Sequence, residues 1–320
     1  MAHPGAYNYP APVMARFYQG SPTASFARSD AKGDGPLQPI VDLLVLGKNV
    51  RVRCPDAGFA AWIRNLYRCM EQPAEGTSDA DLDYRITTSS DPEGFLLAEA
   101  GEPCESAPTA GDILAQMENA LTIALQLQRP DLLFVHAAAL ADADGAIVLV
   151  GPSGAGKSTL AWALTRHGFA YLSDELAPFD PGDAAVVPFP RAIHLKIPPP
   201  GVSELHEDTV DTGAALCVPA ESLPGGVADA PRRLHSLIFL APSPRPAQPE
   251  IRELTSGDAV SRLFANTLNA LAHPAYGVDS AVRIARQARC YELAASDLDA
   301  TCELIVDQTC SGSASGVSCQ

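Results

Sequence analysis

The fold of this chain is decided by nine consecutive residues, Gly151-Pro152-Ser153-Gly154-Ala155-Gly156-Lys157-Ser158-Thr159. They satisfy the pattern G-x-x-x-x-G-K-[ST] at every position. The glycines allow successive backbone N–H groups to turn toward phosphate oxygens, and the helix that follows directs the positive end of its dipole at the same oxygens. By chance the pattern should occur only roughly 0.002–0.003 times in a chain of this composition, so we interpret it as a nucleotide-binding site.

The segments on either side of the motif fit this interpretation. An apolar strand over 146–150 is predicted to enter the loop, and a helix over 158–167 to leave it. Lys157 is expected to reach the β- and γ-phosphates of ATP, and the Ser158 hydroxyl to bind Mg²⁺. Residues 151–159 are therefore all predicted to bind ATP, and Lys157 is also a predicted catalytic residue.

A pair of acidic residues, Asp174 and Glu175, follows the motif after a short interval. The helix is predicted to end at His167-Gly168, and a buried strand over 169–172 leads to the pair. Carboxylates at the end of a strand beside a phosphate loop can hold Mg²⁺ or accept the proton of an attacking hydroxyl. We predict Asp174 as a catalytic residue and metal ligand and Glu175 as a metal ligand. Solvated acids in a turn are the alternative.

Three further polar residues are candidates for the same site. His136 lies in an apolar strand predicted over 132–141, where it either contacts Asp174 and adjusts its basicity or is a core histidine with its hydrogen bonds satisfied. Arg191 and Lys196 are two cations in a chain with only four lysines. They are predicted to bind the substrate or the transferred phosphate, and surface ion pairs are the alternative.

A small α+β unit is predicted before the domain that carries the motif. The predicted parts of the chain are a flexible leader (1–38), the α+β unit (39–105), the motif-bearing domain (106–308) and a flexible tail (309–320). Asp56 is expected to cap a helix, and a Pro/Gly-rich stretch over 101–108 to end the unit. Thr109, with Asp112 three residues later, then opens a long helix. Strands are predicted at 41–46, 50–54, 82–87 and 95–98.

Beyond Glu175 the chain is rich in proline and is predicted to consist largely of loops, with regular structure resuming toward the C-terminus. The predicted strands are 186–187, 192–197, 234–240 and 290–293, and the predicted helices are 258–272, 280–288 and 296–307. Strands and helices that alternate around a phosphate loop place the chain in the α/β class.

Length, charge and hydrophobicity exclude several classes of function. The chain has 320 residues, with 22 Lys plus Arg against 38 Asp plus Glu, and a formal net charge of −16. Nucleic acids and anionic membranes select a dense positive surface, so neither is an expected partner. The hydrophobic fraction of 47% is large enough for a sizeable core and excludes wholesale disorder.

The cysteines and the apolar segments bear on the cellular compartment. The eight cysteines include no C-x-x-C pair and no neighbouring histidines at the spacing of a metal site. We expect reduced, mostly structural thiols, which are typical of a reducing compartment. The sequence contains no signal-peptide core, and no apolar run approaches the ~18–20 residues of a membrane-spanning helix. It therefore predicts a cytoplasmic protein.

A resemblance to a known family rests on residues within forty positions of one another. These are His136, a strand hairpin, the motif 151–159 and the pair Asp174-Glu175. They resemble the catalytic domain of HPr kinase/phosphorylase, and are more similar still to the HPr-kinase-related proteins, which include kinases of lasso-peptide precursors. The resemblance is strongest over about 132–197. It implies a P-loop kinase domain of the HPr kinase / phosphoenolpyruvate carboxykinase type, with ATP and Mg²⁺ as cofactors.

The resemblance also implies roles for individual residues. Asp174 corresponds to the catalytic carboxylate, Glu175 to its neighbour on the metal side and His136 to the histidine that contacts them. The bacterial regulators typically have Asp-Asp at the carboxylate pair and Lys-Ser-Glu where this chain has Lys-Ser-Thr at 157–159. The E-I-R-G-L-G stretch of those enzymes has no counterpart here. The implied activity is therefore ATP-dependent phosphorylation of a hydroxyl, with a serine of a peptide or protein as the expected acceptor. These departures weaken the case for HPr as the acceptor and for the reverse, phosphorylase reaction.

Two other hypotheses remain open on the sequence. A non-catalytic regulatory module would bind nucleotide and phosphorylate nothing. A kinase of a small-molecule hydroxyl would keep the same fold but transfer phosphate only to dialysable material. Related kinases commonly assemble, so the resemblance also implies a homo-oligomer.

Overall fold

The computed structural model describes residues 38–73, 79–202, 205–242 and 246–310 of this protein. The predicted leader (1–38) lies outside the described residues except for Gln38. The predicted tail (309–320) also lies outside them, except for Thr309 and Cys310. These two residues belong to the last helix, which therefore extends further than the predicted 296–307.

The N-terminal part alternates buried and exposed residues with the period of two that is typical of strands. The first sheet has the order β1-β2-β3-β4-β5. Its strands are β1 (Ile40–Val45), β2 (Lys48–Arg53), β3 (Leu82–Ser90), β4 (Glu93–Glu99) and β5 (Glu102–Ala107). β2 and β3 are parallel, so the chain must cross over between them, and α2 (Ala57–Tyr67) lies in this crossover. Asp56 caps α2 as predicted, because its side chain accepts the Phe59 N–H.

The stretch over 101–108, predicted to end the small unit as a loop, instead forms β5. Its proline, Pro103, is compatible with a strand because β5 lies at the edge of the sheet. Thr109 then caps α3 (Ala110–Gln128) as predicted, accepting the Asp112 N–H. In the structure α3 packs against the first sheet. The predicted domain boundary near residue 105 stays a prediction.

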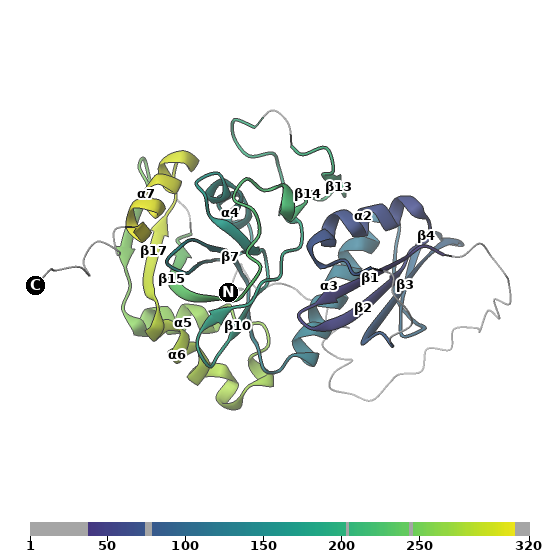
Figure 1. The fold of residues 1–320 in the computed structure, drawn as a ribbon, viewed down its shortest axis with the longest axis horizontal. Helices are drawn as coiled ribbons and strands as arrows, with labels where there is room; N and C mark the ends of the chain where they lie inside the picture. Colours follow the sequence, from purple (N-terminus) through teal and green to yellow (C-terminus); the bar gives the residue numbers. More distant parts are fainter. Residues whose placement is uncertain (1–37, 74–78, 203–204, 243–245, 311–320) are drawn as a thin grey trace, which may run out of the picture. The chain divides into compact units, whose positions relative to one another are not determined.

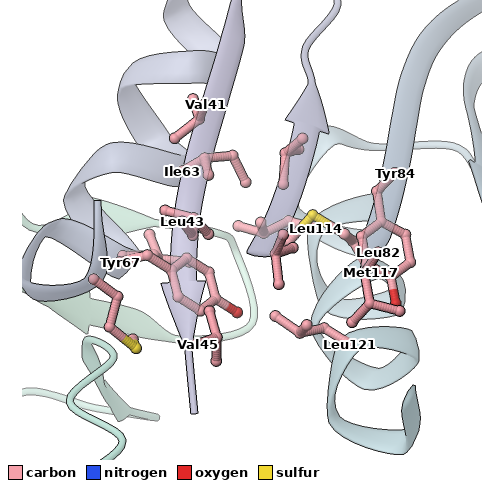
Figure 2. Close-up of a cluster of buried hydrophobic side chains, with 14 of the residues drawn as sticks. Val41, Leu43, Val45, Ile63, Tyr67, Leu82, Tyr84, Leu114, Met117 and Leu121 are labelled. Atoms are coloured by element: carbon pink, nitrogen blue, oxygen red, sulfur yellow. The ribbon is translucent and has the colours of Figure 1, made fainter. Parts of the chain in front are cut away.

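The core of the first sheet consists of apolar side chains from β1, α2, β3 and α3 (Figure 2). Leu43 of β1 and Ile63 of α2 are 1% and 0% exposed, and Leu114 and Met117 of α3 close the cluster from the other side. Burying side chains of this size stabilises the fold by about 1.5–3 kcal/mol each. The N-terminal part is therefore firmly attached to α3, the helix that leads into the rest of the chain.

The second sheet carries the sequence motif. Its main path is β6-β10-β11-β15-β8-β7-β9, and β17 pairs with both β15 and β16. The strands are β6 (Leu133–Val135), β7 (Ala137–Ala141), β8 (Ala146–Val150), β9 (Ala170–Ser173), β10 (Ala177–Asp180), β11 (Ala185–Val186), β15 (Arg232–Leu240), β16 (Glu250–Glu253) and β17 (Arg289–Ala294). β8, β15 and β17 are parallel neighbours, so the loops that follow them lie at the same edge of the sheet.

Helices cover both faces of this sheet (Figure 1). They are α4 (Lys157–Thr165), α5 (Ser256–Ala265), α6 (Val278–Gln287) and α7 (Leu298–Cys310). Successive residues of β8 point to opposite faces: Val148 packs in one core with α5 and α6, and Leu149 packs in the other with α4 and α7. A sheet covered in this way confirms the predicted α/β class.

The remaining elements lie in the proline-rich segment and the connections. A small third sheet has the order β12-β14-β13, formed by β12 (Ile193–Leu195), β13 (Val210–Asp211) and β14 (Leu216–Val218). Short 3₁₀ helices are η1 (Arg68–Met70), η2 (Ala220–Ser222), η3 (Ala270–Ala272) and η4 (Pro274–Gly277). The segment after Glu175 thus contains short strands between long connections, as predicted.

Two predicted elements are wrong in extent, for a shared reason. The single strand predicted over 132–141 is broken at His136, whose backbone N–H donates to Asn266 O at 2.8 Å. The helix predicted over 258–272 ends at Ala265, and the chain after it runs back to meet β6. Phe134 N donates to Asn269 Oδ1, and Asn269 Nδ2 donates to Leu132 O, both at 2.9 Å. These tertiary contacts override the local apolar period.

The structure also bears on the state of the cysteines and on whether a helix could cross a membrane. Cys54, Cys217, Cys290 and Cys302 are buried and free of disulfide bonds, in agreement with the prediction of reduced thiols. Among the described residues, no helix combines the length and apolar character that crossing a membrane requires.

We predict that Asn269→Ala lowers the free energy of unfolding by about 2 kcal/mol, because the buried Phe134 N–H loses its acceptor while Leu132 O keeps the His273 ring as a contact. Denaturant titration measures the change. Asn266→Ala is the matched control, since its amide contacts only the helix-end carbonyl of Arg262, and its cost should be below about 1 kcal/mol. Equal losses in both variants would contradict the assignment.

Candidate active site

The sequence motif forms the connection between β8 and α4. β8 is buried along its whole length and ends at Val150, and α4 begins at Lys157. Gly154 and Gly156 adopt φ angles of +80° and +96°, which residues with a Cβ rarely adopt. Gly156 is the N-cap of α4 and has no side chain to accept its first N–H groups. Those N–H groups are available to an anion at the start of the helix.

Lys157 is held against the same loop. Its ammonium donates to Gly151 O at 2.8 Å and to Pro152 O at 3.2 Å, and the residue is 5% exposed. Burial lowers the pKa of Lys157, while the charges of Asp174 and Glu175 raise it. The single positive charge of the loop therefore lies within electrostatic reach of the carboxylate pair.

Asp174 contacts the motif directly. Ser158 Oγ donates to Asp174 Oδ1 at 3.1 Å, and Asp174 is fully buried at the end of β9. Its other oxygen, Oδ2, is buried without a hydrogen-bond partner among the described residues. Burial and then the charge of Glu175 raise the pKa of Asp174. Leaving such an oxygen unpaired costs roughly 1–3 kcal/mol, and such sites in a cleft are candidates for binding or proton transfer.

Glu175 follows Asp174 but faces a different environment. Its backbone is left-handed at φ +64°, a conformation that is unusual for a residue other than glycine. Glu175 Oε2 accepts from Arg191 Nη2 at 2.7 Å. Burial acts to raise the pKa of Glu175, but the charges of Arg191 and His194 outweigh it and leave the pKa below its ordinary value. Glu175 is therefore the carboxylate of the pair that stays ionised.

His136 lies at the break between β6 and β7. Burial, followed by the charge of Lys157, lowers the pKa of His136 to about 4, and Glu175 opposes this shift. The imidazole is therefore neutral at neutral pH and lies within electrostatic reach of Lys157 and Glu175. The predicted contact with Asp174 stays a prediction.

Arg191 and Lys196 differ in their surroundings. Arg191 is 5% exposed, and its terminal nitrogens donate to Glu118 and Glu175, so the guanidinium is engaged by carboxylates and is not presented to a substrate. Of its two ion pairs, the one with Glu118 is buried, and the one with Glu175 reaches the surface through a carboxylate side chain that is 44% exposed. Lys196 is exposed, and its charge acts on Lys157, so it lies near the loop. A role of Lys196 in substrate binding stays a prediction.

The sequence analysis did not predict the residues that contact Arg191 on the side away from Glu175. Glu118 Oε1 accepts from Arg191 Nη1 at 3.0 Å and from Tyr67 Oη at 3.2 Å, and lies 3.6 Å from His194 Nε2. One signal was available: Glu118 lies on the apolar face of α3 between Leu114 and Leu121, where a carboxylate needs a buried partner. The identity of that partner could not be read from the sequence.

A cavity of about 210 Å³ lies beside the loop, at the ends of β15 and β17. Except for Ser153 its lining is apolar or glycine: Pro152, Ser153, Gly154, Ala155, Leu240, Ala241, Pro242, Pro246, Ala294 and Ala295. A cavity next to the motif, lined by small apolar side chains together with polar backbone, can accept the flat, uncharged part of a nucleotide.

The oxygens at the loop suit a magnesium ion bound together with a nucleotide. Among the described residues, no group of three or more His, Cys, Asp and Glu could hold a metal by itself. Mg²⁺ at phosphate sites takes one or two carboxylates, with phosphates and water completing its shell. Ser158 Oγ and the unpartnered Asp174 Oδ2 provide oxygen ligands of the required kind.

Comparison with known proteins adds little. No family model matches the chain. A search of curated proteins found no match either. Among solved structures, the Hpr(Ser) kinase/phosphatase from Coxiella burnetii aligns with 38% of this chain and 76% of its own, at 19% identity and a TM-score of 0.22. A likeness at this score carries no argument, so the function has to be inferred from the residues and their geometry.

We predict that Asp174→Asn raises the free energy of unfolding by about 1 kcal/mol at pH 8, because it removes a buried charge with one unpaired oxygen. The pKa of Asp174 is raised above its unfolded value of 3.8, so the folded protein binds the proton more tightly. Wild type therefore loses stability as pH rises through the interval between the two pKa values.

The gain of Asp174→Asn over wild type should accordingly be smallest below pH 4. Denaturant titrations at several pH values provide the measurement. Asp229→Asn is the control, because that side chain is 92% exposed and its replacement should change stability by less than about 0.5 kcal/mol. A gain that is the same at pH 4 and pH 8 would contradict the explanation.

Proposed function

We propose that this protein is a Mg²⁺- and ATP-dependent kinase of the HPr-kinase-like type, which transfers the γ-phosphoryl group to a hydroxyl, with a serine of a peptide or protein as the acceptor. The observation that carries the proposal is the contact of the motif's Ser158 with Asp174, a fully buried carboxylate whose second oxygen has no partner among the described residues. A loop that only bound nucleotide would not require this costly group beside it.

Phosphate binding is assigned to the loop and to Lys157. The left-handed Gly154 and Gly156 turn the backbone so that N–H groups at the start of α4 point out of the helix toward the nucleotide. Lys157 exchanges its contacts with the carbonyls of Gly151 and Pro152 for the β- and γ-phosphates. Because the lysine already lies along the loop, little reorganisation is needed for this exchange.

Ser158, Asp174 and Glu175 are the residues proposed to hold Mg²⁺. When bound, the ion would neutralise charge on the β- and γ-phosphates. Arg191 keeps Glu175 ionised and in place, and the Ser158 hydroxyl turns from Asp174 toward the ion. The neutral His136 adds no positive charge to repel a cation at this point.

Asp174 is proposed to accept the proton of the acceptor hydroxyl. Its pKa is raised by burial and by Glu175, and a base with a raised pKa takes a proton more readily near neutral pH. As the hydroxyl oxygen forms its bond to the γ-phosphorus, the bond from that phosphorus to the β–γ bridging oxygen breaks. ADP leaves, and the proton passes to the Asp174 carboxylate, on the oxygen that does not hold the ion.

We predict that Lys157→Ala weakens ATP binding at least tenfold, because the buried ammonium group that would contact the phosphates is lost. Asp174→Asn should bind ATP but transfer phosphate about 10²–10⁴-fold more slowly, the usual contribution of a general base. Radiolabelled ATP added to a lysate of the source cells measures transfer, and fluorescence of an ATP analogue measures binding. Retention of wild-type transfer by both variants would contradict the site.

The same assay separates the remaining functions. Label in a protein or peptide supports the proposed acceptor, and label found only in dialysable material indicates a small-molecule hydroxyl. ATP binding without any labelled acceptor favours a non-catalytic regulatory module. Asp229→Asn again serves as the control, because this exposed carboxylate should affect neither binding nor transfer.

The cavity beside the loop is proposed to receive the nucleotide base. We predict that Ala294→Phe, which fills the cavity, weakens ATP binding about tenfold and leaves the binding of inorganic tripolyphosphate unchanged, since tripolyphosphate has no base. Competition against a fluorescent ATP analogue measures both. The control is Ala61→Phe at an exposed position of α2, which should change neither affinity. Equal loss of both ligands in Ala294→Phe would place the base elsewhere.

A further inference from the structure

We infer that Glu118 of α3 is a positioning residue, which acts through Arg191 to determine how the Glu175 carboxylate is presented to a divalent cation at the phosphate loop. The inference rests on the proposed function, which makes Glu175 a metal ligand. It extends that function by making the first sheet and its helices part of the active site.

The environment of Glu118 requires charged partners. The residue is 7% exposed and lies among the apolar side chains of α3 that pack into the first core. An ionised carboxylate removed from water to this extent is tolerated only where hydrogen bonds and an opposite charge compensate it. Arg191 Nη1 at 3.0 Å and Tyr67 Oη at 3.2 Å provide them, and both contact the same oxygen, Oε1.

Arg191 joins Glu118 to the carboxylate pair. Its Nη1 donates to Glu118 and its Nη2 to Glu175 at 2.7 Å, so one planar guanidinium fixes both carboxylates. The backbone at this point is held as well: Ala192 N donates to Leu66 O at 2.7 Å. Because Nη1 and Nη2 belong to one planar group beside an anchored backbone, a change in the contact with Glu118 is passed on to the contact with Glu175.

The sign of the effect on a metal ion is set by the charges. Arg191 carries one positive charge that is shared between two negative groups. If Glu118 is made neutral, the whole positive charge of Arg191 acts on Glu175 and on any cation that approaches it. A tenfold change in the affinity for a divalent ion corresponds to about 1.4 kcal/mol, which is the scale expected from removing one nearby charge. Mg²⁺ binding should therefore weaken by about tenfold.

The alternative is that Glu118 merely completes a buried ion pair and is needed for folding alone. That role predicts a loss of stability without any change in the Mg²⁺ requirement of the protein that remains folded. A measurement of Mg²⁺ dependence, independent of turnover, therefore distinguishes the two roles.

The test uses the full chain, an ATP analogue whose fluorescence reports binding, and a titration with Mg²⁺. Glu118→Gln keeps the shape of the side chain and should raise the Mg²⁺ concentration for half-maximal binding about tenfold. In an Arg191→Met background the same substitution should have no further effect, because the charge through which it acts is gone. Melting temperatures measured without metal report the purely structural cost.

Glu221→Gln is the matched control. Glu221 pairs with Arg68 of η1 at 2.8 Å, but this pair is partly exposed and does not involve Arg191. Its loss should leave the Mg²⁺ midpoint within twofold of wild type. If Glu118→Gln fails to fold, Tyr67→Phe replaces it, since it removes one of the hydrogen bonds to Glu118 Oε1 while keeping the ring; a midpoint shift of at least twofold is then expected.

The outcomes separate the inference from the proposed function. Wild type that binds no nucleotide in the presence of Mg²⁺ would overturn both. Two results would overturn the inference alone, provided that wild type binds nucleotide. One is a Mg²⁺ midpoint of Glu118→Gln within twofold of the wild-type midpoint. The other is an equal effect of Glu118→Gln in the wild-type and Arg191→Met backgrounds. A tenfold shift that Arg191→Met abolishes supports the inference.

Discussion

A charge removed from water must be paired, and the arrangement of this site depends on how the chain meets that requirement for Arg191. The residue is 5% exposed, and its guanidinium lies between Glu118 and Glu175. Glu118 comes from the helix that packs on the first sheet, and Glu175 follows the strand that ends beside the phosphate loop. Satisfying one buried cation therefore joins the first sheet's helix to the end of the second sheet that carries the motif.

Of the two neighbouring carboxylates, one has a charged partner and the other has an oxygen without a hydrogen-bond partner among the described residues. Glu175 is held by Arg191, whereas Asp174 Oδ2 has no hydrogen-bond partner in the described part of the chain. The two neighbouring carboxyls thus have pKa values shifted in opposite directions, upward for Asp174 and downward for Glu175. A pair separated in this way can divide the work, one group accepting a proton and the other remaining an ionised ligand.

The net charge of −16 bears on how a nucleotide could bind to this protein. A protein of this charge repels a free nucleotide at long range, so affinity must come from donors fixed at short range. The loop glycines, the start of α4 and the buried Lys157 are such donors. Because they are arranged by β8 and α4, the rigidity of that strand–loop–helix unit determines how well phosphate can be bound.

The sequence by itself determined the local parts of this protein. The motif 151–159, the strand before it, the helix after it and the carboxylates Asp174 and Glu175 could all be predicted, because glycine conformation, apolar period and charge act over a few residues. The caps Asp56 and Thr109 were predicted for the same reason. The α/β class followed from the alternation of these elements.

Only the tertiary structure decided which distant residues meet. The break at His136 and the early end of α5 arise from hydrogen bonds between segments about 130 residues apart, which no local pattern encodes. Arg191 was expected at the substrate and lies instead in a buried ion pair, because its partner Glu118 precedes it by 73 residues. The sequence shows that a buried charge needs a counter-charge, but burial and pairing are set jointly by packing, and packing exists only in the folded chain.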